Sequence, residues 1–200
     1  EGDDLNTFFN YISKADFSTL KGNISEYTEE IINKRTGNKI SIAHETLRSA
    51  QEVSIANFLY LNSIDYRYEK PYQFNIIRAH KPYTPDFTLK QGDKIAYLEH
   101  FGITEDGRNN RYTAEQLEKY KAAINDKVIL HRKHNTDLIY TFSSYNDGRP
   151  MLEHLKEQLI EHGFVLNQRS SQEVFEKIVN TEENKYILKL VKLICTFIQN

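Results

Sequence analysis

Cysteine, tryptophan and long hydrophobic runs are scarce or absent in this 200-residue chain. It has one cysteine, Cys195, and no tryptophan. A single cysteine cannot close an intrachain disulfide or build a zinc site by itself, which fits a reducing cytoplasm. No apolar run approaches the roughly 18 residues of a membrane-spanning helix, and no secretory signal is recognised. We therefore expect a cytoplasmic protein that does not enter a membrane.

The chain also lacks an excess of positive charge and a phosphate-binding loop. The 26 Lys and Arg residues against 28 Asp and Glu leave a net charge of −2, which argues against a general cationic coat for nucleic acid. The pattern Gly-x-x-x-x-Gly-Lys-[Ser/Thr] does not occur, so the chain alone is not expected to hydrolyse ATP. A local basic cluster could still meet DNA phosphates, or could be an ordinary solvated surface. Its members are Arg108, Arg111, Lys127, Arg132, Lys133 and His134. Of these, we predict that Arg108, Arg111, Arg132 and Lys133 contact DNA.

Length and composition favour one main core with helical additions. With 39% hydrophobic and 12% aromatic residues, 200 residues can bury one good core. We predict an α/β core over residues 40–163, after a break at 36–38, with helical extensions over 1–39 and 164–200. The last predicted helix, 186–198, is apolar around most of its circumference and must pack on this domain or another one.

Two carboxylates fall on one predicted β-hairpin. Residues 87–89 and 95–99 follow the two-residue period of strands, and a turn-rich segment joins them. Asp86 at the start of one strand can then sit across from Glu99 at the end of the other. Two such charges about 4 Å apart repel by roughly 1 kcal/mol in water, and Mg²⁺ or Mn²⁺ would remove that conflict. The alternative makes Asp86 a turn residue after proline and Glu99 a solvated strand end.

A third carboxylate, Glu52, lies in a predicted helix over residues 49–59. Apolar residues recur there at helical spacing, and Ser49 is a suitable N-cap with Glu52 at the third position. Glu52 is therefore either a helix-capping residue or part of a metal site. The next segment, 62–72, reads as a turn and a strand that lead towards the hairpin.

The order and spacing of these segments resemble a known nuclease module. The segments are Glu52 with Ile55–Leu59, Tyr66–Glu69, Tyr83–Phe87 and Leu98–Gly102. Together they resemble the PD-(D/E)xK nuclease module associated with UvrD-like superfamily 1 DNA helicases. The resemblance covers residues 40–163.

The resemblance implies a restriction-endonuclease-like, RecB-like fold, in which helices flank a mixed β-sheet. It implies hydrolysis of DNA phosphodiester bonds with Mg²⁺, or Mn²⁺ in its place. Asp86, Glu99 and Glu52 are implied as metal ligands, with the main-chain carbonyl of His100 as a further one. A helicase motor domain, in the same or another chain, is the implied partner in DNA repair or processing.

One position departs from the family pattern. The motif places a lysine two residues after the glutamate, and here that residue is Phe101. Phenylalanine can neither orient water nor stabilise charge on a phosphate. In variants of the superfamily the lysine migrates to a neighbouring helix, and the predicted helix over residues 120–131 offers Lys127.

The periodicity of that helix favours Lys127 over Lys121. Tyr120, Ile124, Lys127 and His131 share one face, which includes an apolar residue and so points inward. Lys121 lies about 100° away around the helix. We expect Lys127 to be catalytic, with Tyr120 and His131 in support. The alternative is an ordinary solvated face.

His100 follows Glu99 and therefore points to the opposite face of the sheet. There it supports the site from outside, or is simply a structural histidine.

A competing interpretation of the whole chain is a catalytically silent nucleic-acid-binding or protein-docking module that retains the nuclease fold. The phenylalanine in place of the motif's lysine leaves that interpretation open. Metal binding discriminates the two, because a silent module need not bind Mg²⁺ with its carboxylates.

Overall fold

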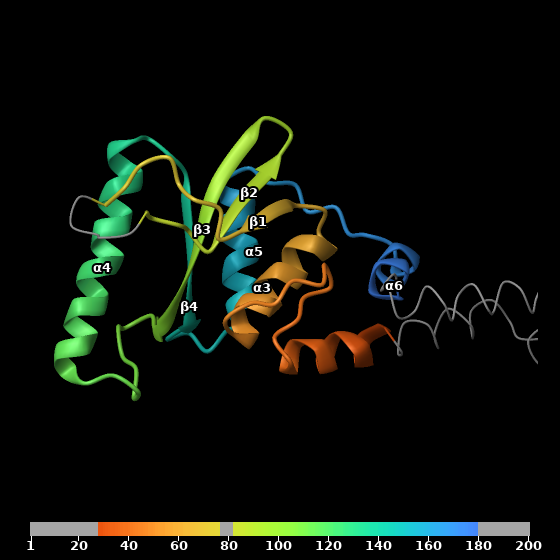
Figure 1. The fold of residues 1–200 in the computed structure, drawn as a ribbon, viewed down its shortest axis with the longest axis horizontal. Coiled ribbons are helices and arrows are strands. Elements are labelled where there is room, and N and C mark those ends of the chain that lie inside the picture. The colour runs from red at the N-terminus through yellow and green to blue at the C-terminus, as the bar shows by residue number, and fades with distance from the viewer. Residues whose placement is uncertain (1–27, 77–81, 180–200) are drawn as a thin grey trace, which may run out of the picture. The chain divides into compact units, whose positions relative to one another are not determined.

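The computed structural model describes residues 28–76 and 82–179 (Figure 1). Contacts divide the chain into two units. One is Leu47–Arg169, and the other combines Glu1–Thr46 with Ser170–Asn200. The helix predicted over residues 186–198 lies outside the described residues, as does the 1–27 part of the N-terminal extension.

A four-stranded mixed sheet forms the centre of the Leu47–Arg169 unit, with strand order β1-β2-β3-β4. The strands are β1 (Asp65–Tyr68), β2 (Phe87–Gln91), β3 (Lys94–Thr104) and β4 (Leu138–Ser144). The first three are antiparallel neighbours, and β4 runs parallel to β3. The predicted hairpin is confirmed as β2 and β3, joined by a tight turn in which Gly92 has a φ of 59°.

Three helices cover this sheet: α3 (Ala50–Leu61), α4 (Ala114–Lys133) and α5 (Met151–Glu161). The parallel pair β3 and β4 needs a crossover connection, which α4 supplies. In Figure 1, α4 lies on one side of the sheet, and α3 and α5 lie on the other. The predicted helix start is confirmed, because the Ser49 side chain accepts a hydrogen bond from the Glu52 N–H at 3.1 Å.

The main hydrophobic core lies on the α3 and α5 side of the sheet. Alternate side chains of the hairpin point into it, among them Phe87, Leu89, Ala96 and Leu98. Because side chains alternate along a strand, Tyr97 and Glu99 face α4 instead. A smaller buried cluster of Tyr72, Tyr83 and Leu130 lies on that second side. The sheet thus holds its hydrophobic core on one face and its candidate site on the other.

The second unit contains a helix over residues 28–37 and the helix α6 (Ser171–Val179). The Arg35 guanidinium donates to the carbonyl of Ile178 at 2.8 Å, which ties these two helices together. A helix is found where the sequence predicts one, but it extends to residue 37, into the predicted break at residues 36–38.

The boundaries of the units differ from the predicted ones by a few residues. Phe164 is buried in the main core, and the N–H groups of Asn167 and Arg169 bond to the end of α3. Contacts of this kind place residues 164–169 with the sheet unit, although they follow the last helix of the predicted core.

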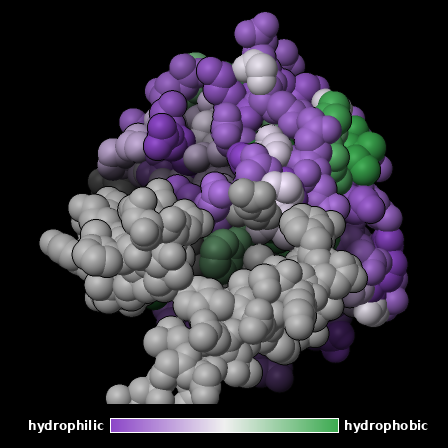
Figure 2. Space-filling view, turned by 90° about the vertical axis from the view of Figure 1, so that its right-hand side faces the viewer, coloured by the Kyte–Doolittle hydropathy of each residue, from purple (hydrophilic) through white to green (hydrophobic). Residues whose placement is uncertain are grey.

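The described residues therefore adopt the predicted mixed α/β architecture. Among the atoms that Figure 2 colours by hydropathy, hydrophilic ones predominate, and a compact hydrophobic group lies at the right-hand edge (Figure 2). None of the described helices is long and apolar enough to cross a membrane.

Candidate active site

Asp86 and Glu99 lie opposite each other at one end of the β2–β3 hairpin. The strand register pairs Phe87 with Leu98, so the next position along pairs Asp86 with Glu99. Glu99 is only 1% exposed, which rules out a solvated strand end. Asp86 accepts a hydrogen bond from the His100 N–H at 2.7 Å. Both predicted carboxylates therefore meet on neighbouring strands.

Both carboxylate oxygens of Glu99 are hydrogen-bonded. Tyr83 donates its hydroxyl to Oε1 at 2.6 Å, and the Lys127 ammonium donates to Oε2 at 2.6 Å. Lys127 Nζ also lies 5.8 Å from the centre of the Phe101 ring. Lys127 thus approaches Phe101, the strand position at which the resemblance led us to expect a lysine.

Burial and repulsion disturb the titration of Asp86. Burial raises the pKa of Asp86 to about 7, and the negative charge of Glu99 adds to the effect. The Lys127 charge and the hydrogen bond from His100 N–H oppose it. Burial and the charge of Glu99 also raise the pKa of Tyr83 well above its usual range, so this hydroxyl remains a donor.

A chain of hydrogen bonds holds Tyr83 in place. His131 Nε2 lies 3.1 Å from the Tyr83 hydroxyl, and His131 Nδ1 lies 2.8 Å from Thr136 Oγ1. The Tyr72 hydroxyl contacts the same Thr136 oxygen at 2.6 Å. Burial lowers the pKa of His131 to about 4, so the ring is neutral at pH 7. With its proton on Nε2, every donor in the chain points towards Glu99.

Helix α4 directs one of its lysines inward and another to the surface. Its Tyr120 hydroxyl accepts a hydrogen bond from the Gly102 N–H of β3 at 3.1 Å. Lys121 instead pairs with Glu118 at 3.3 Å on the exposed side. Because Lys127 is 27% exposed and bonded to a buried carboxylate, the predicted face points inward and is no solvated surface.

Glu52 is held by residues near its own helix start. Tyr68 donates its hydroxyl to Oε2 at 2.6 Å, and Ser49 donates to Oε1 at 3.2 Å. In the described part of the chain, no three His, Cys, Asp or Glu side chains form a group that could hold a metal ion. Two of the three predicted ligands, Asp86 and Glu99, therefore come together. Glu52 lies close enough for its charge to raise the pKa of Asp86 further.

The His100 side chain lies on the opposite face from Glu99, as its position in the strand predicts. Its Nδ1 is 2.9 Å from Thr141 Oγ1, and its Nε2 is 3.2 Å from Gln51 Oε1. Burial lowers the pKa of His100 to about 4, so the ring is neutral at pH 7. It links β3 to β4 and α3 behind the site.

The predicted phosphate-binding residues are exposed at two separate places. Arg108 and Arg111 line a polar pocket of about 450 Å³ between the end of β3 and the start of α4. Arg108 is ion-paired with Asp106. Arg132 and Lys133 lie in the last turn of α4, so the sequence cluster is divided between the two ends of one helix.

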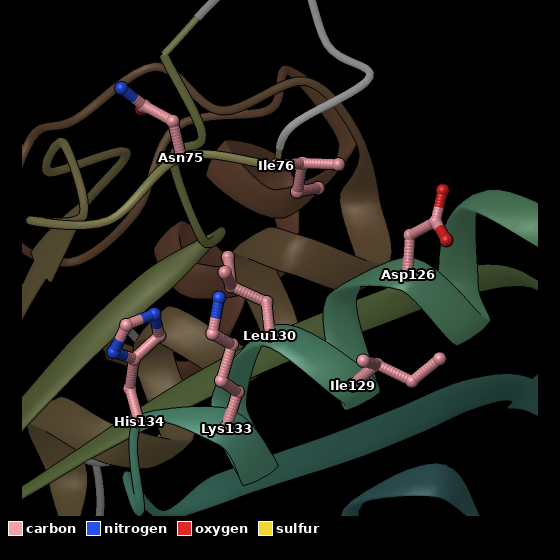
Figure 3. A pocket seen from close by; sticks show the side chains of 7 residues that line it. All are labelled: Asn75, Ile76, Asp126, Ile129, Leu130, Lys133 and His134. Carbon is pink, nitrogen blue, oxygen red and sulfur yellow. The ribbon is translucent and has the colours of Figure 1, made fainter.

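Lys133 lines a smaller pocket of about 220 Å³ at that end of α4 (Figure 3). Figure 3 shows Leu130 on α4 and His134 just after its last residue, with Asn75 on a separate segment across from them. The His134 ring stacks on Phe74 with 3.5 Å between ring centres. Lys133 therefore shares this pocket with His134, whose ring is stacked on Phe74.

Sequence reasoning missed the roles of Tyr83, Thr136 and Tyr72. A buried tyrosine hydroxyl needs a hydrogen-bond partner, but the sequence does not show which tyrosines are buried. Nor does any periodicity connect Tyr83 with His131, 48 positions later.

Comparison of the chain with protein families, curated proteins and solved structures finds no match. The chemistry of the site therefore has to carry any functional conclusion.

Proposed function

We propose that this chain is a metal-dependent nuclease domain of restriction-endonuclease-like fold that hydrolyses DNA phosphodiester bonds. The observation that carries the proposal is the Asp86–Glu99 pair across β2 and β3, with Lys127 bonded to Glu99. Two carboxylates and a lysine supply oxygen ligands and a fixed positive charge, which are the groups that phosphodiester hydrolysis uses. Work alongside a superfamily 1 helicase in DNA repair or processing belongs to the same proposal.

The carboxylate pair fits Mg²⁺ or Mn²⁺. Mg²⁺ keeps several waters and is usually held by one or two carboxylates plus substrate phosphates, so two protein ligands suffice. The raised pKa of Asp86 is the strain that a bound cation would relieve. Such an ion lowers the pKa of a bound water and offsets phosphate charge. The His100 carbonyl is proposed as a third oxygen ligand.

The surrounding side chains would act on water, phosphate or the ligands. Lys127 would position the attacking water or stabilise charge that develops on the phosphate. Tyr83 donates to Glu99 Oε1 and is itself held by His131, while the Tyr120 hydroxyl accepts from the Gly102 N–H of β3. Glu52 would complete the site through water. Arg108, Arg111, Arg132 and Lys133 would contact the DNA backbone.

Cleavage of labelled DNA by the full chain tests the proposal. Single-stranded and duplex substrates are incubated with Mg²⁺, Mn²⁺ or chelator, with Asp86→Ala as the matched variant. We expect cleavage by the wild type that requires metal, and none by the variant. Cleavage that persists in chelator, or in the variant, would contradict the metal-site assignment.

A second candidate function is a silent nucleic-acid-binding or docking module. It is favoured by the occupation of both Glu99 oxygens by Tyr83 and Lys127, and by the absence of a three-ligand group in the described residues. Titration calorimetry with Mn²⁺ discriminates the two. The nuclease binds the ion through Asp86 and fails to bind it in Asp86→Ala, whereas the silent module shows no such difference.

A further inference from the structure

A groove of about 510 Å³ lies on the α4-facing side of the sheet, beside the carboxylate pair. In the antiparallel strands, cross-strand neighbours form rows, and the Asp86–Glu99 row ends the hairpin. The next two rows on the same face are Arg67–Thr88–Tyr97 and Asp65–Lys90–Ile95. Successive rows on one face are about 7 Å apart, because side chains alternate and each residue rises by about 3.4 Å. The groove therefore begins one row from the candidate active site.

Positive charge dominates this groove. Three exposed cations line it, Arg67, Lys70 and Lys90, against one acid, Asp65. Among the described residues, none of the three cations has an ion-pair partner, unlike Lys127, which is bonded to Glu99. A concentration of unpaired cations in a chain of net charge −2 is complementary to an anion.

The floor of the groove is aromatic and apolar. Tyr97 packs edge-on against Tyr72, with 4.7 Å between ring centres, and lines the groove as well. Ile95 is 51% exposed, which is unusual for an isoleucine in a central strand. Opposite Tyr97 on the neighbouring strand, Thr88 completes the floor.

We infer that the groove binds a single DNA strand and leads it to the carboxylate pair. Cations that meet phosphates, beside a ring and an apolar side chain that meet bases, are the combination used for single strands. A duplex keeps its bases stacked inside and cannot use this floor. The inference rests on the proposed function and specifies its substrate class, a single strand.

Binding of a fluorescent oligo-dT to the full chain tests this groove without any cleavage, because chelator is present. Lys90→Glu is compared with Lys156→Glu, a charge reversal at an exposed lysine on α5, outside the groove. We expect Lys90→Glu to weaken binding at least tenfold and Lys156→Glu to change it less than twofold. The slope of log affinity against log salt concentration should also become shallower in Lys90→Glu, by about 0.7 for each phosphate that is no longer neutralised.

Wild-type affinity in Lys90→Glu, or equal weakening in the groove variant and its control, would overturn the groove inference. Tighter binding of a duplex of the same length than of oligo-dT would overturn it too.

Failure of the proposed function would give a different result from failure of the groove inference. Asp86→Ala should bind oligo-dT in chelator with unchanged or higher affinity, since a nearby negative charge is removed. If that variant also cleaves DNA like the wild type, the nuclease site is wrong while the binding result for the groove still stands.

Discussion

Glu99 is the residue around which the site is organised. A carboxylate that is 1% exposed is costly to bury unless it is paired and hydrogen-bonded, and here Tyr83 and Lys127 provide both. Buried ion pairs are a weak source of stability, because desolvation offsets most of the attraction. We therefore interpret these contacts as fixing the positions of Glu99, Tyr83 and Lys127 and the charges of the Glu99–Lys127 pair.

Lys127→Ala should lower the rate of DNA cleavage by about 10²- to 10³-fold, the usual effect of removing a group that stabilises transition-state charge. Metal affinity should not fall, because Lys127 is no ligand. Lys121→Ala is the matched control and should stay within about twofold, since Lys121 pairs with Glu118 at the surface. Single-turnover rates and Mn²⁺ titration measure both quantities. Reversed effects of the two variants would make Lys121 the catalytic group.

The pKa of Asp86 gives a pH-dependent prediction for stability. Its folded pKa is raised from 3.8 to about 7, so the unfolded chain releases this proton first as pH rises. The free energy of unfolding therefore falls between about pH 4 and pH 7, by on the order of 4 kcal/mol. Asp86→Asn removes this decrease.

Chemical denaturation in chelator at pH 5 and pH 8 checks that prediction. The advantage of Asp86→Asn over the wild type should grow by about 3 kcal/mol between the two values. His100 and His131, whose pKa values are lowered to about 4, add stability as pH rises towards 6.5. They are common to both proteins, so the difference isolates Asp86. An advantage that is constant with pH would show that Asp86 titrates normally.

At the scale of elements, α4 assembles the site by docking on one face of the sheet. It carries Tyr120, Lys127 and His131 on a single side, and its capping box at Thr113 and Gln116 sets where the helix begins. Each of the three side chains contacts either β3 or the Tyr83 segment. The helix and the hairpin therefore position the site only together.

Tyr83→Phe should remove one of the two links between α4 and Glu99, the one that runs from His131 through the Tyr83 hydroxyl. The change leaves Glu99 Oε1 and His131 Nε2 without their shared partner, which should cost about 1 to 3 kcal/mol of unfolding free energy. Cleavage should slow as well, because Glu99 is less well fixed. Tyr112→Phe, at an exposed tyrosine before α4, is the control and should change neither. If both variants unfold at the same temperature, the hydrogen-bond chain through Tyr83 does not contribute to stability.

At the scale of the whole molecule, the Leu47–Arg169 unit contains the complete main core and every candidate site residue. A fragment of residues 47–169 should therefore unfold cooperatively and cleave DNA with metal, as measured by calorimetry and the cleavage assay. A fragment that stops after Gly163 should be less stable, because it lacks the buried Phe164. If the longer fragment is unfolded, the unit depends on the rest of the chain.

Local patterns in the sequence determined the elements and the faces of this protein. The hairpin, the Ser49 cap and the inward side of α4 depend on residues a few positions apart, so periodicity and capping chemistry predict them. The pairing of Asp86 with Glu99 followed from the short turn between their strands. In each case the interactions that determine the structure join residues that are close in the sequence.

Only the tertiary structure decided which distant groups meet. Glu52 could serve as a cap or as a ligand on sequence grounds, and the hydroxyl of Tyr68 now occupies one of its oxygens. The bond between Tyr83 and His131 depends on how α4 docks on the sheet, which no periodicity encodes. The groove likewise arises because α4 leaves part of that face open, next to the row of Asp86 and Glu99. A helix or strand forms from residues that are close in the sequence, whereas docking brings together surfaces from remote parts of the chain.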